Sequence, residues 1–289
     1  MNGSTTKGGL IMLSDILTSL PQSEQKIARY ILEFPEEAVT YTASELGEKC
    51  HASSAAVIRL CKSLKLKGFQ ELKLRIVGDL HKSEVEGYRD IKPHESIASV
   101  LATTTNNGIQ ALRETSEIVN MDAVSQVVDA LIKARQILFF GVGASSIIAL
   151  DAQQKFLRIN KPASAFTDVH MVAMQIANMT AEDVIFGISY SGETSEVVDV
   201  LKLANSKGCR TVSLTQFGNS PVVSIAHMNL FTSASKEATF RSAATSSRLA
   251  QLHMIDVLFM CVASEQYEET IQYLDGTREA IRFMKTQRR

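Results

Sequence analysis

The chain has 289 residues, which is long for a single domain and sufficient for two. Its residues are 45% hydrophobic and its net charge is −1, a composition that excludes an intrinsically disordered chain and a uniformly basic one. Because the sequence has no apolar run of about 18 residues and no signal peptide, we expect a cytoplasmic protein without membrane contact. Residues 1–11 begin with a polar, Gly- and Thr-rich stretch and are predicted to be disordered.

The cysteines and most histidines are spread along the chain without the spacing of a metal site. There is no CxxC pair, and each cysteine lies in an apolar pattern, which favours reduced thiols packed in cores over disulfides. We therefore expect no metal and no cofactor. The residues concerned are Cys50, Cys61, Cys209, Cys261, His51, His81, His94, His227 and His253.

Two short helices are predicted near the N-terminus. Within residues 23–34, apolar residues recur at helical spacing, and Pro35 ends the pattern. A second helix is predicted over residues 42–50, where Thr42, followed three residues later by Glu45, is the signature of a capping box.

A third helix is predicted from Ser53 or Ser54 to about Leu64. Its apolar side chains form one stripe that we expect to be buried: Val57, Leu60, Cys61 and Leu64. Small and basic side chains face the other way: Ser54, Ala55, Ile58, Arg59 and Lys62. Two short helices joined by a tight turn, the second presenting small polar residues and then basic ones, are typical of a helix-turn-helix.

Basic residues are concentrated in residues 49–82, where eight Lys or Arg residues stand against two acidic ones, a net charge of +6. A basic segment in a nearly neutral chain indicates a polyanionic partner, although a solvated helical face explains charge alone more simply. The helix-turn-helix pattern favours double-stranded operator DNA, because small residues allow close approach and basic ones reach guanine or phosphates. The predicted DNA contacts are Ser53, Ser54, Ala55, Arg59, Lys62 and Lys67.

Residues 83–95 are charged and are predicted to link an α-helical helix-turn-helix domain, residues 1–82, to a second domain, residues 96–289. Helical patterns fill residues 96–134. Strands are then predicted at 136–142, 163–167, 183–188, 210–214 and 229–232, separated or followed by helices at 146–159, 169–178, 195–207, 241–263 and the C-terminus. This alternation predicts an α/β domain with a parallel sheet covered by helices on both faces.

Two hydroxyl-rich turns follow strands of this second domain. Residues 141–146 (Gly-Val-Gly-Ala-Ser-Ser) follow the first strand, and residues 189–194 (Ser-Tyr-Ser-Gly-Glu-Thr) follow the third. At a helix N-terminus, outward N–H groups and the helix dipole bind anions, and Ser and Thr hydroxyls add donors. Ligands of such sheets bind at the carboxyl ends of the strands. The two turns therefore predict a small phosphorylated ligand held from two sides.

Two plainer explanations of these turns stay open. Gly141 and Gly143 match the start of a dinucleotide-binding turn, and Asp168 ends the second strand; but Ser146 stands where the third glycine belongs, and the second turn has no role there. Alternatively, the hydroxyls only cap helices. One hydroxyl satisfies a cap, so the cluster in residues 189–194 favours ligand binding.

The turns resemble those of the sugar isomerase (SIS) domain, which binds phosphosugars. Residues 56–64 and 67–69 are similar to the helix-turn-helix of RpiR-type bacterial regulators. Together the two resemblances cover about residues 12 to 289. Residues 241–252 look closest to MurR-like regulators, which sense N-acetylmuramic acid 6-phosphate.

The resemblance implies roles for individual residues. Hydroxyls of both turns would hold the phosphate, two glycines would let the backbone approach it, and a histidine and a glutamate stand nearest to the acid/base groups of SIS isomerases. The ligand-binding residues predicted in this way are Gly143, Ser145, Ser146, Ser189, Ser191, Gly192, Thr194, His170 and Glu237. Arg241 and Ser242 are alternatives for the sugar pocket.

The resemblance further implies a bacterial transcription regulator, a repressor released from its operator by a phosphosugar, in amino-sugar or carbohydrate catabolism. We expect a homodimer or homotetramer, which pairs recognition helices, with residues 96–118 and 249–263 as candidate interfaces.

The alternative is a phosphosugar isomerase or lyase with a helical N-terminal extension. It needs a base beside the first carbons of the sugar, for which Glu193, Glu237 and His170 are the candidates. Because an isomerase has no use for the +6 segment, we expect no enzymatic activity.

Overall fold

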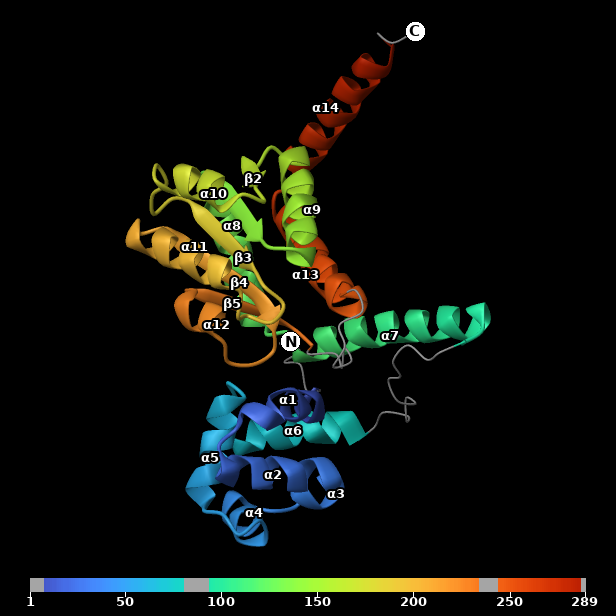
Figure 1. Cartoon of the computed structure of the whole chain (residues 1–289), viewed down its shortest axis with the longest axis vertical. Coiled ribbons are helices and arrows are strands. Elements are labelled where there is room, and N and C mark those ends of the chain that lie inside the picture. Colours follow the sequence, from blue (N-terminus) through green and yellow to red (C-terminus); the bar gives the residue numbers. More distant parts are fainter. Residues whose placement is uncertain (1–7, 81–93, 234–243, 287–289) are drawn as a thin grey trace. The chain divides into compact units, whose positions relative to one another are not determined.

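The computed structural model describes residues 8–80, 94–233 and 244–286. The chain divides into two compact units, which are described separately below (Figure 1). Unit 1 contains Met1–Met121, Gln216–Asn219 and Phe231–Ala250, and unit 2 contains Asp122–Thr215, Ser220–Leu230 and Gln251–Arg289. Most of the predicted linker lies outside the described residues, so the domain limits drawn from the sequence stay a prediction.

The described part of unit 1 is mainly helical. Its first helices are α1 (Gly9–Ile16), a 3-10 turn (Leu17–Ser19), α2 (Gln22–Glu33), α3 (Pro35–Ala38), α4 (Ala43–Lys49), α5 (Ser54–Ser63), α6 (Phe69–Leu80) and α7 (Ile97–Ile118). The three helices predicted at 23–34, 42–50 and 53–64 are therefore present as α2, α4 and α5, with ends that differ by one residue.

The start of the chain differs from the prediction. α1 begins at Gly9, so the expected disorder is wrong for residues 9–11, while residues 1–7 lie outside the described part. The buried carboxylate of Asp79, on α6, accepts the backbone N–H groups of Gly8 at 2.6 Å and Leu10 at 2.8 Å. These bonds satisfy donors that a helix N-terminus leaves unpaired, and they hold α1 against α6.

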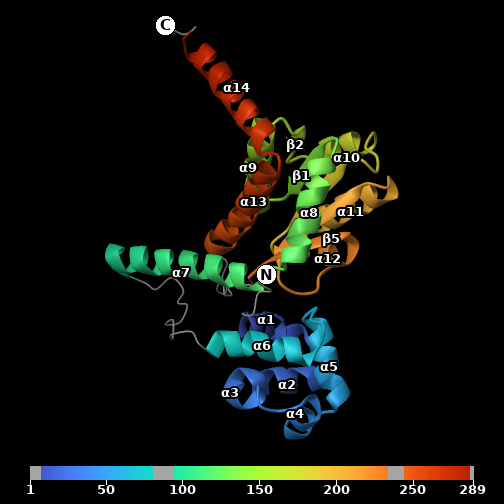
Figure 2. The same ribbon diagram turned by 180° about the vertical axis from the view of Figure 1, so that it is seen from behind.

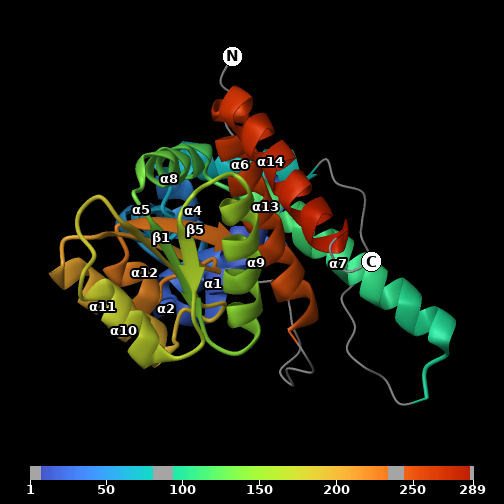
Figure 3. The same ribbon diagram turned by 90° about the horizontal axis from the view of Figure 1, so that it is seen from above.

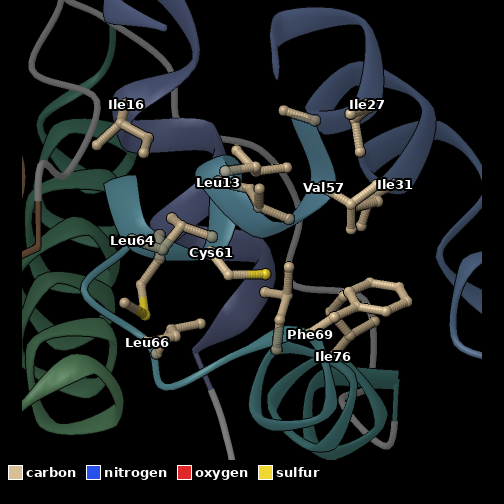
Figure 4. Packing of buried hydrophobic residues seen from close by; sticks show 14 of the residues in the cluster. Leu13, Ile16, Ile27, Ile31, Val57, Cys61, Leu64, Leu66, Phe69 and Ile76 are labelled. Atoms are coloured by element: carbon tan, nitrogen blue, oxygen red, sulfur yellow. The ribbon is translucent and has the colours of Figure 1, made fainter. Parts of the chain in front are cut away.

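The core of unit 1 gathers side chains from α1, α2, α5 and α6, and Figure 4 shows how they converge. The predicted stripe of α5 is fully buried in this core: Val57, Leu60, Cys61 and Leu64. Burial also raises the pKa of the Cys61 thiol to about 11, so this cysteine stays neutral and acts as a packing group. Because one side of α5 is buried in the core, its opposite side must face outward.

Unit 2 is built around a five-stranded sheet. The elements that lie wholly or mainly in unit 2, in chain order, are α8 (Met121–Lys133), β1 (Ile137–Gly141), α9 (Ala144–Arg158), β2 (Ala163–Ala165), α10 (Val169–Ile176), β3 (Val184–Ile188), α11 (Ser195–Ser206), β4 (Arg210–Gln216), α12 (Pro221–Ile225), β5 (Met228–Thr232), α13 (Thr245–Glu265) and α14 (Tyr267–Thr286). The strand order is β2-β1-β3-β4-β5, and β1 pairs in parallel with β2 and β3, as β3 does with β4.

Helices cover both faces of this sheet, as predicted (Figure 3). On one face, Leu138 of β1 and Ile185 of β3 pack in one cluster with residues of α10, α11 and α12. On the other, the ring of Phe139 contacts Phe156 of α9 at 5.5 Å, and Phe156 contacts Phe259 of α13 at 6.1 Å, measured between ring centroids. Figure 2, seen from behind, brings α8 to the front of the strands.

The short helix α12 is missing from the sequence prediction. Ser220 caps it by accepting the N–H of Val223, and Pro221 occupies its first position. Both are recognised start signals, but a five-residue helix is too short to show an apolar period. It follows β4 directly and lies beside the second hydroxyl-rich turn.

Candidate functional site

The turn between α4 and α5 sets the angle between the two helices. Thr42 and Glu45 form the predicted capping box at the start of α4, and the hydrogen bonds with Thr42 lower the pKa of the Glu45 carboxyl. A Cβ on Gly47 would lie 3.0 Å from backbone atoms of Ser53 and Ser54, so only glycine lets α4 approach the turn this closely. α5 then starts at its cap, Ser53, whose hydroxyl accepts the N–H of Ala56 at 3.2 Å.

The outward face of α5 carries the predicted DNA-contacting side chains. In the structure all six predicted positions are exposed: Ser53, Ser54, Ala55, Arg59, Lys62 and Lys67. Five of them lie on α5 or at its cap, and Lys67 follows in the turn before α6. This face is small at its N-terminal end and basic at its C-terminal end, the shape and charge that suit an approach to a DNA groove.

A buried glutamate stands behind this face and was not foreseen from the sequence. The Glu24 side chain, on α2, is only 4% exposed, and its carboxylate accepts the Ser63 hydroxyl at 3.0 Å. The other carboxylate oxygen lies 3.5 Å from Nε of Arg59, whose side chain is 55% exposed. Glu24 therefore engages the inner nitrogen of Arg59 and leaves the outer end of the guanidinium towards solvent.

The first hydroxyl-rich turn joins β1 to α9. A Cβ on Gly141 would lie 2.8 Å from the backbone of Ser145 and 2.9 Å from the carbonyl oxygen of Ile188, so glycine is required where the turn passes β3. Gly143 has φ +59° and precedes α9 without a side-chain cap. Ser145 is buried, and the Ser146 hydroxyl donates to the Gly143 carbonyl at 2.7 Å.

The second hydroxyl-rich turn joins β3 to α11. Ser189 is 2% exposed, and its hydroxyl accepts the Gly192 N–H at 3.1 Å and shares a 2.8 Å hydrogen bond with the Thr194 hydroxyl. Ser191 is half-buried and accepts the Glu193 N–H at 3.2 Å. Thr194 precedes α11 as its cap residue but makes no side-chain capping bond. The buried Ser189 hydroxyl therefore stabilises the turn through its two hydrogen bonds, while Ser191 and Thr194 lie nearer the surface.

Gly192 is the residue that this turn can least replace. It has φ +71°, and a Cβ there would lie 2.1 Å from the Ser220 hydroxyl oxygen. Its carbonyl accepts the N–H of Val222, at the start of α12. Ser220 and α12 therefore form a third wall of the turn, which sequence reasoning missed because α12 was missed.

The sheet brings the two turns together. Gly141, the last residue of β1, pairs with Ile188, the last residue of β3, so residues 141–146 and 189–194 start side by side. From β1 the chain crosses to β2 on one side, and from β3 to β4 on the other. The turns thus flank the point where the strand order reverses, which is where open α/β sheets bind their ligands.

Of the remaining predicted ligand residues the structure describes His170, which makes no hydrogen bond to either turn. His170 is exposed at the start of α10, where its N–H donates to the Asp168 carboxylate at 2.7 Å. Glu237, Arg241 and Ser242 lie outside the described residues, and their roles stay predictions.

The described residues contain no cluster of three or more His, Cys, Asp or Glu side chains able to hold a metal ion. Nor does any helix within residues 8–80, 94–233 and 244–286 combine the length and apolar character needed to cross a membrane.

Comparison with known proteins assigns both halves of the chain. Residues 7–83 match the helix-turn-helix domain of the rpiR family, and residues 130–261 match the SIS domain. A relative from Bacillus subtilis, the uncharacterized HTH-type transcriptional regulator YbbH, is 51% identical over 96% of this chain and 98% of its own length.

The chain belongs to the rpiR family of helix-turn-helix transcriptional regulators with a SIS domain.

Three further proteins are similar to this rpiR-family regulator at lower sequence identity. The HTH-type transcriptional regulator HexR of Pseudomonas aeruginosa is 32% identical over 95% of the chain and 96% of its own length. The Vibrio vulnificus NanR protein, solved as a complex with ManNAc-6P, has a TM-score of 0.60 at 26% identity and covers 94% of this chain and 98% of its own. A putative sugar-phosphate isomerase from Listeria monocytogenes, 23% identical with a TM-score of 0.57 over 61% of this chain and 94% of its own, shares the fold.

Proposed function

We propose that this rpiR-family regulator is a cytoplasmic repressor whose SIS domain binds a phosphosugar at the two hydroxyl-rich turns and thereby releases α5 from an operator. The observation that carries the proposal is the pairing of Gly141 with Ile188, which sets the two turns side by side at the reversal point of the strand order. A ligand there meets two helix N-termini at once, those of α9 and α11. Such termini favour an anion even without a lysine.

The phosphate is proposed to bind between the turns. Ser191 and Thr194 supply hydroxyl donors from the α11 side. Ser145 supplies one from the α9 side, and Ser146 adds another by exchanging its bond to the Gly143 carbonyl for one to the phosphate. At the start of α9 the N–H groups of Ser145 and Ser146 already donate to the carbonyls of Val142 and Gly143. Further backbone donors are therefore proposed to come mainly from the first turn of α11. An added Cβ on Gly143 would meet no atom within 4 Å, so the first turn leaves its backbone open to the phosphate there. Gly192 gives the second turn its positive φ and its close contact with Ser220, and Ser189 holds that turn in shape through its bonds to Gly192 and Thr194.

The sugar is proposed to be an amino-sugar 6-phosphate, with N-acetylmuramic acid 6-phosphate as the first candidate. Two observations support this class: the resemblance of residues 241–252 to MurR-like regulators, and the ManNAc-6P complex of the NanR protein. His170 and Glu237 are the proposed contacts to the sugar beyond its phosphate.

The DNA-binding surface is proposed to be the exposed face of α5 with Lys67. Small residues at the start of α5 let the helix enter the major groove, Arg59 and Lys62 reach guanine or phosphate, and a homodimer or homotetramer presents two such helices to a palindromic site. The net charge of +6 in residues 49–82 supports this surface.

One experiment tests the ligand half. Thermal unfolding of the full chain is measured with each of five sugar phosphates and with the corresponding unphosphorylated sugars. The phosphates are the 6-phosphates of muramic acid, N-acetylmuramic acid, glucosamine, N-acetylglucosamine and N-acetylmannosamine. We expect one phosphorylated sugar to raise Tm, because a ligand bound only to the native state stabilises it, by about 2.7 kcal/mol at a hundredfold excess over Kd. A shift from an unphosphorylated sugar alone, or none from any phosphosugar, contradicts the proposal.

The isomerase alternative is separated by turnover. The proposal predicts that the stabilising phosphosugar is recovered unchanged after long incubation with the protein. Conversion of an aldose to a ketose phosphate would instead favour the enzyme, and gel shifts with the same sample would then show no release of DNA.

A further inference from the structure

One buried amide in unit 2 has no hydrogen-bond partner within the chain. Gln251, on α13, is 2% exposed, and its side-chain nitrogen Nε2 finds no acceptor among the described residues. In the described part of unit 2, no other buried side-chain nitrogen or oxygen is in this position. A buried amide without a partner has lost its bonds to water and gained none in the protein, so it destabilises the fold. Such a group is explained when its partner is a ligand.

The side of α13 on which Gln251 lies is otherwise apolar. Ile255, Leu258 and Val262 are fully buried and follow one another at the three- and four-residue spacings of a single helical side. Gln251 lies on the same side, four residues before Ile255. A leucine or methionine would fill this position without burying an unpaired donor. The amide is therefore better explained by binding than by packing.

Contacts between α13 and α9 show how the two helices are aligned. Lys155 of α9 forms an ion pair with Asp256 of α13 at 2.9 Å, and the ring of Phe156 contacts the ring of Phe259. The two helices run in the same direction, and both end on the side where β2 and α14 lie (Figures 1 and 2). Because α9 begins at the carboxyl end of β1, α13 also begins at that end of the sheet, where the two hydroxyl-rich turns lie.

The alignment indicates how far Gln251 lies from the first hydroxyl-rich turn. Counted back from the contact between Phe156 and Phe259, Gln251 is eight residues earlier on α13 and Ser145 is eleven residues earlier on α9. At about 1.5 Å per residue, the two positions differ by about 5 Å along the helix axis, less than one turn. A helical side chain slopes towards the N-terminal end of its helix, so we expect the Gln251 amide at the level of Ser145.

The two faces of the sheet contribute to different parts of the proposed ligand site. α11, which follows the second hydroxyl-rich turn, packs on one face, whereas α9 and α13 pack on the other. A phosphate held mainly at the start of α11 leaves the sugar to extend towards the start of α9 and α13. A neutral amide there is a suitable donor to a hydroxyl, ring or carbonyl oxygen of a sugar.

We propose that Gln251 is a sugar-binding residue, whose Nε2 donates a hydrogen bond to an oxygen of the sugar part of the phosphosugar. The inference rests on the proposed function and adds a contact that neither hydroxyl-rich turn supplies.

The first test removes the amide from the full-length protein. Gln251→Met keeps the length of the side chain, and calorimetry gives Kd for N-acetylmuramic acid 6-phosphate, or for the phosphosugar of the panel above that raises Tm. This Kd is expected to rise about tenfold, the usual cost of one lost hydrogen bond. Kd for inorganic phosphate should not change. Tm of the ligand-free variant should equal or exceed that of the wild type, because the unpaired amide is gone.

The matched control is Gln154→Met, on the exposed side of α9, which should change none of these three quantities. Wild-type affinity for the sugar in Gln251→Met, together with a lowered Tm, would show a structural role and overturn the inference. Equal losses for the sugar and for inorganic phosphate would place the amide at the phosphate and also overturn it. If the wild type binds no phosphosugar of the panel, the proposed function itself fails, and this inference fails with it.

The second test observes the amide directly and does not depend on the stability of the methionine variant. In a nitrogen-15 NMR spectrum of the full chain, the side-chain NH2 signals of Gln251 are those missing from Gln251→Glu, which has the same shape. Adding the phosphosugar is expected to shift these signals, whereas adding inorganic phosphate should leave them in place. Signals that do not respond to a phosphosugar that binds the wild type would exclude the contact.

Discussion

At the residue scale, the surroundings of Arg59 bear directly on its proposed contact with DNA. Its side chain is exposed enough to reach DNA, while its Nε forms an ion pair with the buried carboxylate of Glu24. Glu24 also accepts the Ser63 hydroxyl, so its carboxylate is fixed before Arg59 binds it. With Nε turned towards Glu24, the two terminal nitrogens of the planar guanidinium stay available, and these are donors that guanine recognition uses. Glu24 is therefore a positioning residue for the proposed base contact.

Glu24→Gln tests this positioning. The amide keeps the size of the side chain and its acceptor for Ser63, but removes the charge that attracts Arg59. Affinity for duplexes selected by the wild type from a random library is expected to fall by up to about 1 kcal/mol, because the pair is half exposed. Non-specific affinity, which depends on phosphate contacts, should not fall.

The control is built into a double-mutant cycle. Arg59→Ala alone is expected to cost about 1–3 kcal/mol of specific binding. In the Arg59→Ala background, adding Glu24→Gln should cause no further loss of specific affinity. Glu33 is exposed on the same helix as Glu24, so Glu33→Gln should leave DNA affinity unchanged. If the two losses simply add, Glu24 does not act through Arg59.

The hydroxyls of the second turn differ in burial and hence in the role proposed for each. Ser191→Ala is expected to weaken phosphosugar binding by about 1–3 kcal/mol, the usual cost of losing a hydrogen bond to a charged group. The measurement is calorimetry with the sugar that raises Tm, and Ser206→Ala, at the far end of α11, is the control. Wild-type affinity in the Ser191 variant removes this hydroxyl from the site.

At the residue scale, sequence reasoning identified which side of α5 is exposed but not Glu24. The apolar stripe of α5 has a helical period, so its burial and the exposure of Arg59 followed directly. Glutamate is rarely buried, and the distance from Glu24 to Arg59 in the sequence gives no sign that they meet. Only the packing of α2 against α5 reveals the pair.

At the scale of elements, the alternation of strands and helices was predictable and the strand order was not. Buried strands read as short apolar runs, which located β1, β3 and β4 within a few residues. Whether β3 lies beside β1 or beside β2 leaves no trace in such runs, because both arrangements bury the same residues. The two turns could therefore be read as anion-binding from the sequence, but their adjacency comes from the register of β1 and β3.

An ion pair fixes this register at the opposite ends of the strands. Arg135, before β1, donates to both carboxylate oxygens of Asp183, before β3, from Nε at 2.9 Å and from a terminal nitrogen at 2.6 Å. Burial by itself raises the pKa of the Asp183 carboxyl. Hydrogen bonds from Arg135 and Thr180 have a larger effect in the opposite direction, so this pKa lies below its usual value. A carboxyl with a depressed folded-state pKa stabilises the fold only while it is ionised.

Arg135→Gln is therefore expected to destabilise unit 2 near pH 7, because it leaves the buried Asp183 carboxylate without its charged partner. The stability that the pair contributes is complete above the ordinary carboxyl pKa of about 3.9 and is lost as pH falls through the lower folded-state value. The difference between variant and wild type, followed by urea unfolding, should thus shrink towards zero below about pH 4. Lys202→Gln, on the exposed side of α11, should show no such difference, and a gap constant with pH would exclude the ion pair as its source.

At the scale of the whole molecule, positive charge is concentrated in one segment of the chain. The protein carries a net charge of −1, while residues 49–82 carry +6, so the rest of the chain is acidic by comparison. DNA attracts the basic segment and repels the remainder, which favours one orientation of approach. Because neutralised phosphates release counterions, operator affinity should fall steeply with salt. Phosphosugar binding at the proposed site should show no salt dependence of comparable size, since it would involve a single small anion.

The two binding activities must be linked if the protein is a sugar-responsive repressor. We expect the stabilising phosphosugar to weaken operator binding by about 5–150-fold, the usual range of coupling between sites. By linkage, operator DNA must weaken sugar binding by the same factor. The two factors are measured independently, by fluorescence anisotropy of labelled operator with saturating sugar, and by calorimetry of the sugar with saturating operator. Ser191→Ala should shift the sugar concentration needed for release without changing DNA affinity in its absence. A sugar that binds but leaves operator affinity unchanged would show that unit 2 senses it for another purpose, and the proposed repression mechanism would fail.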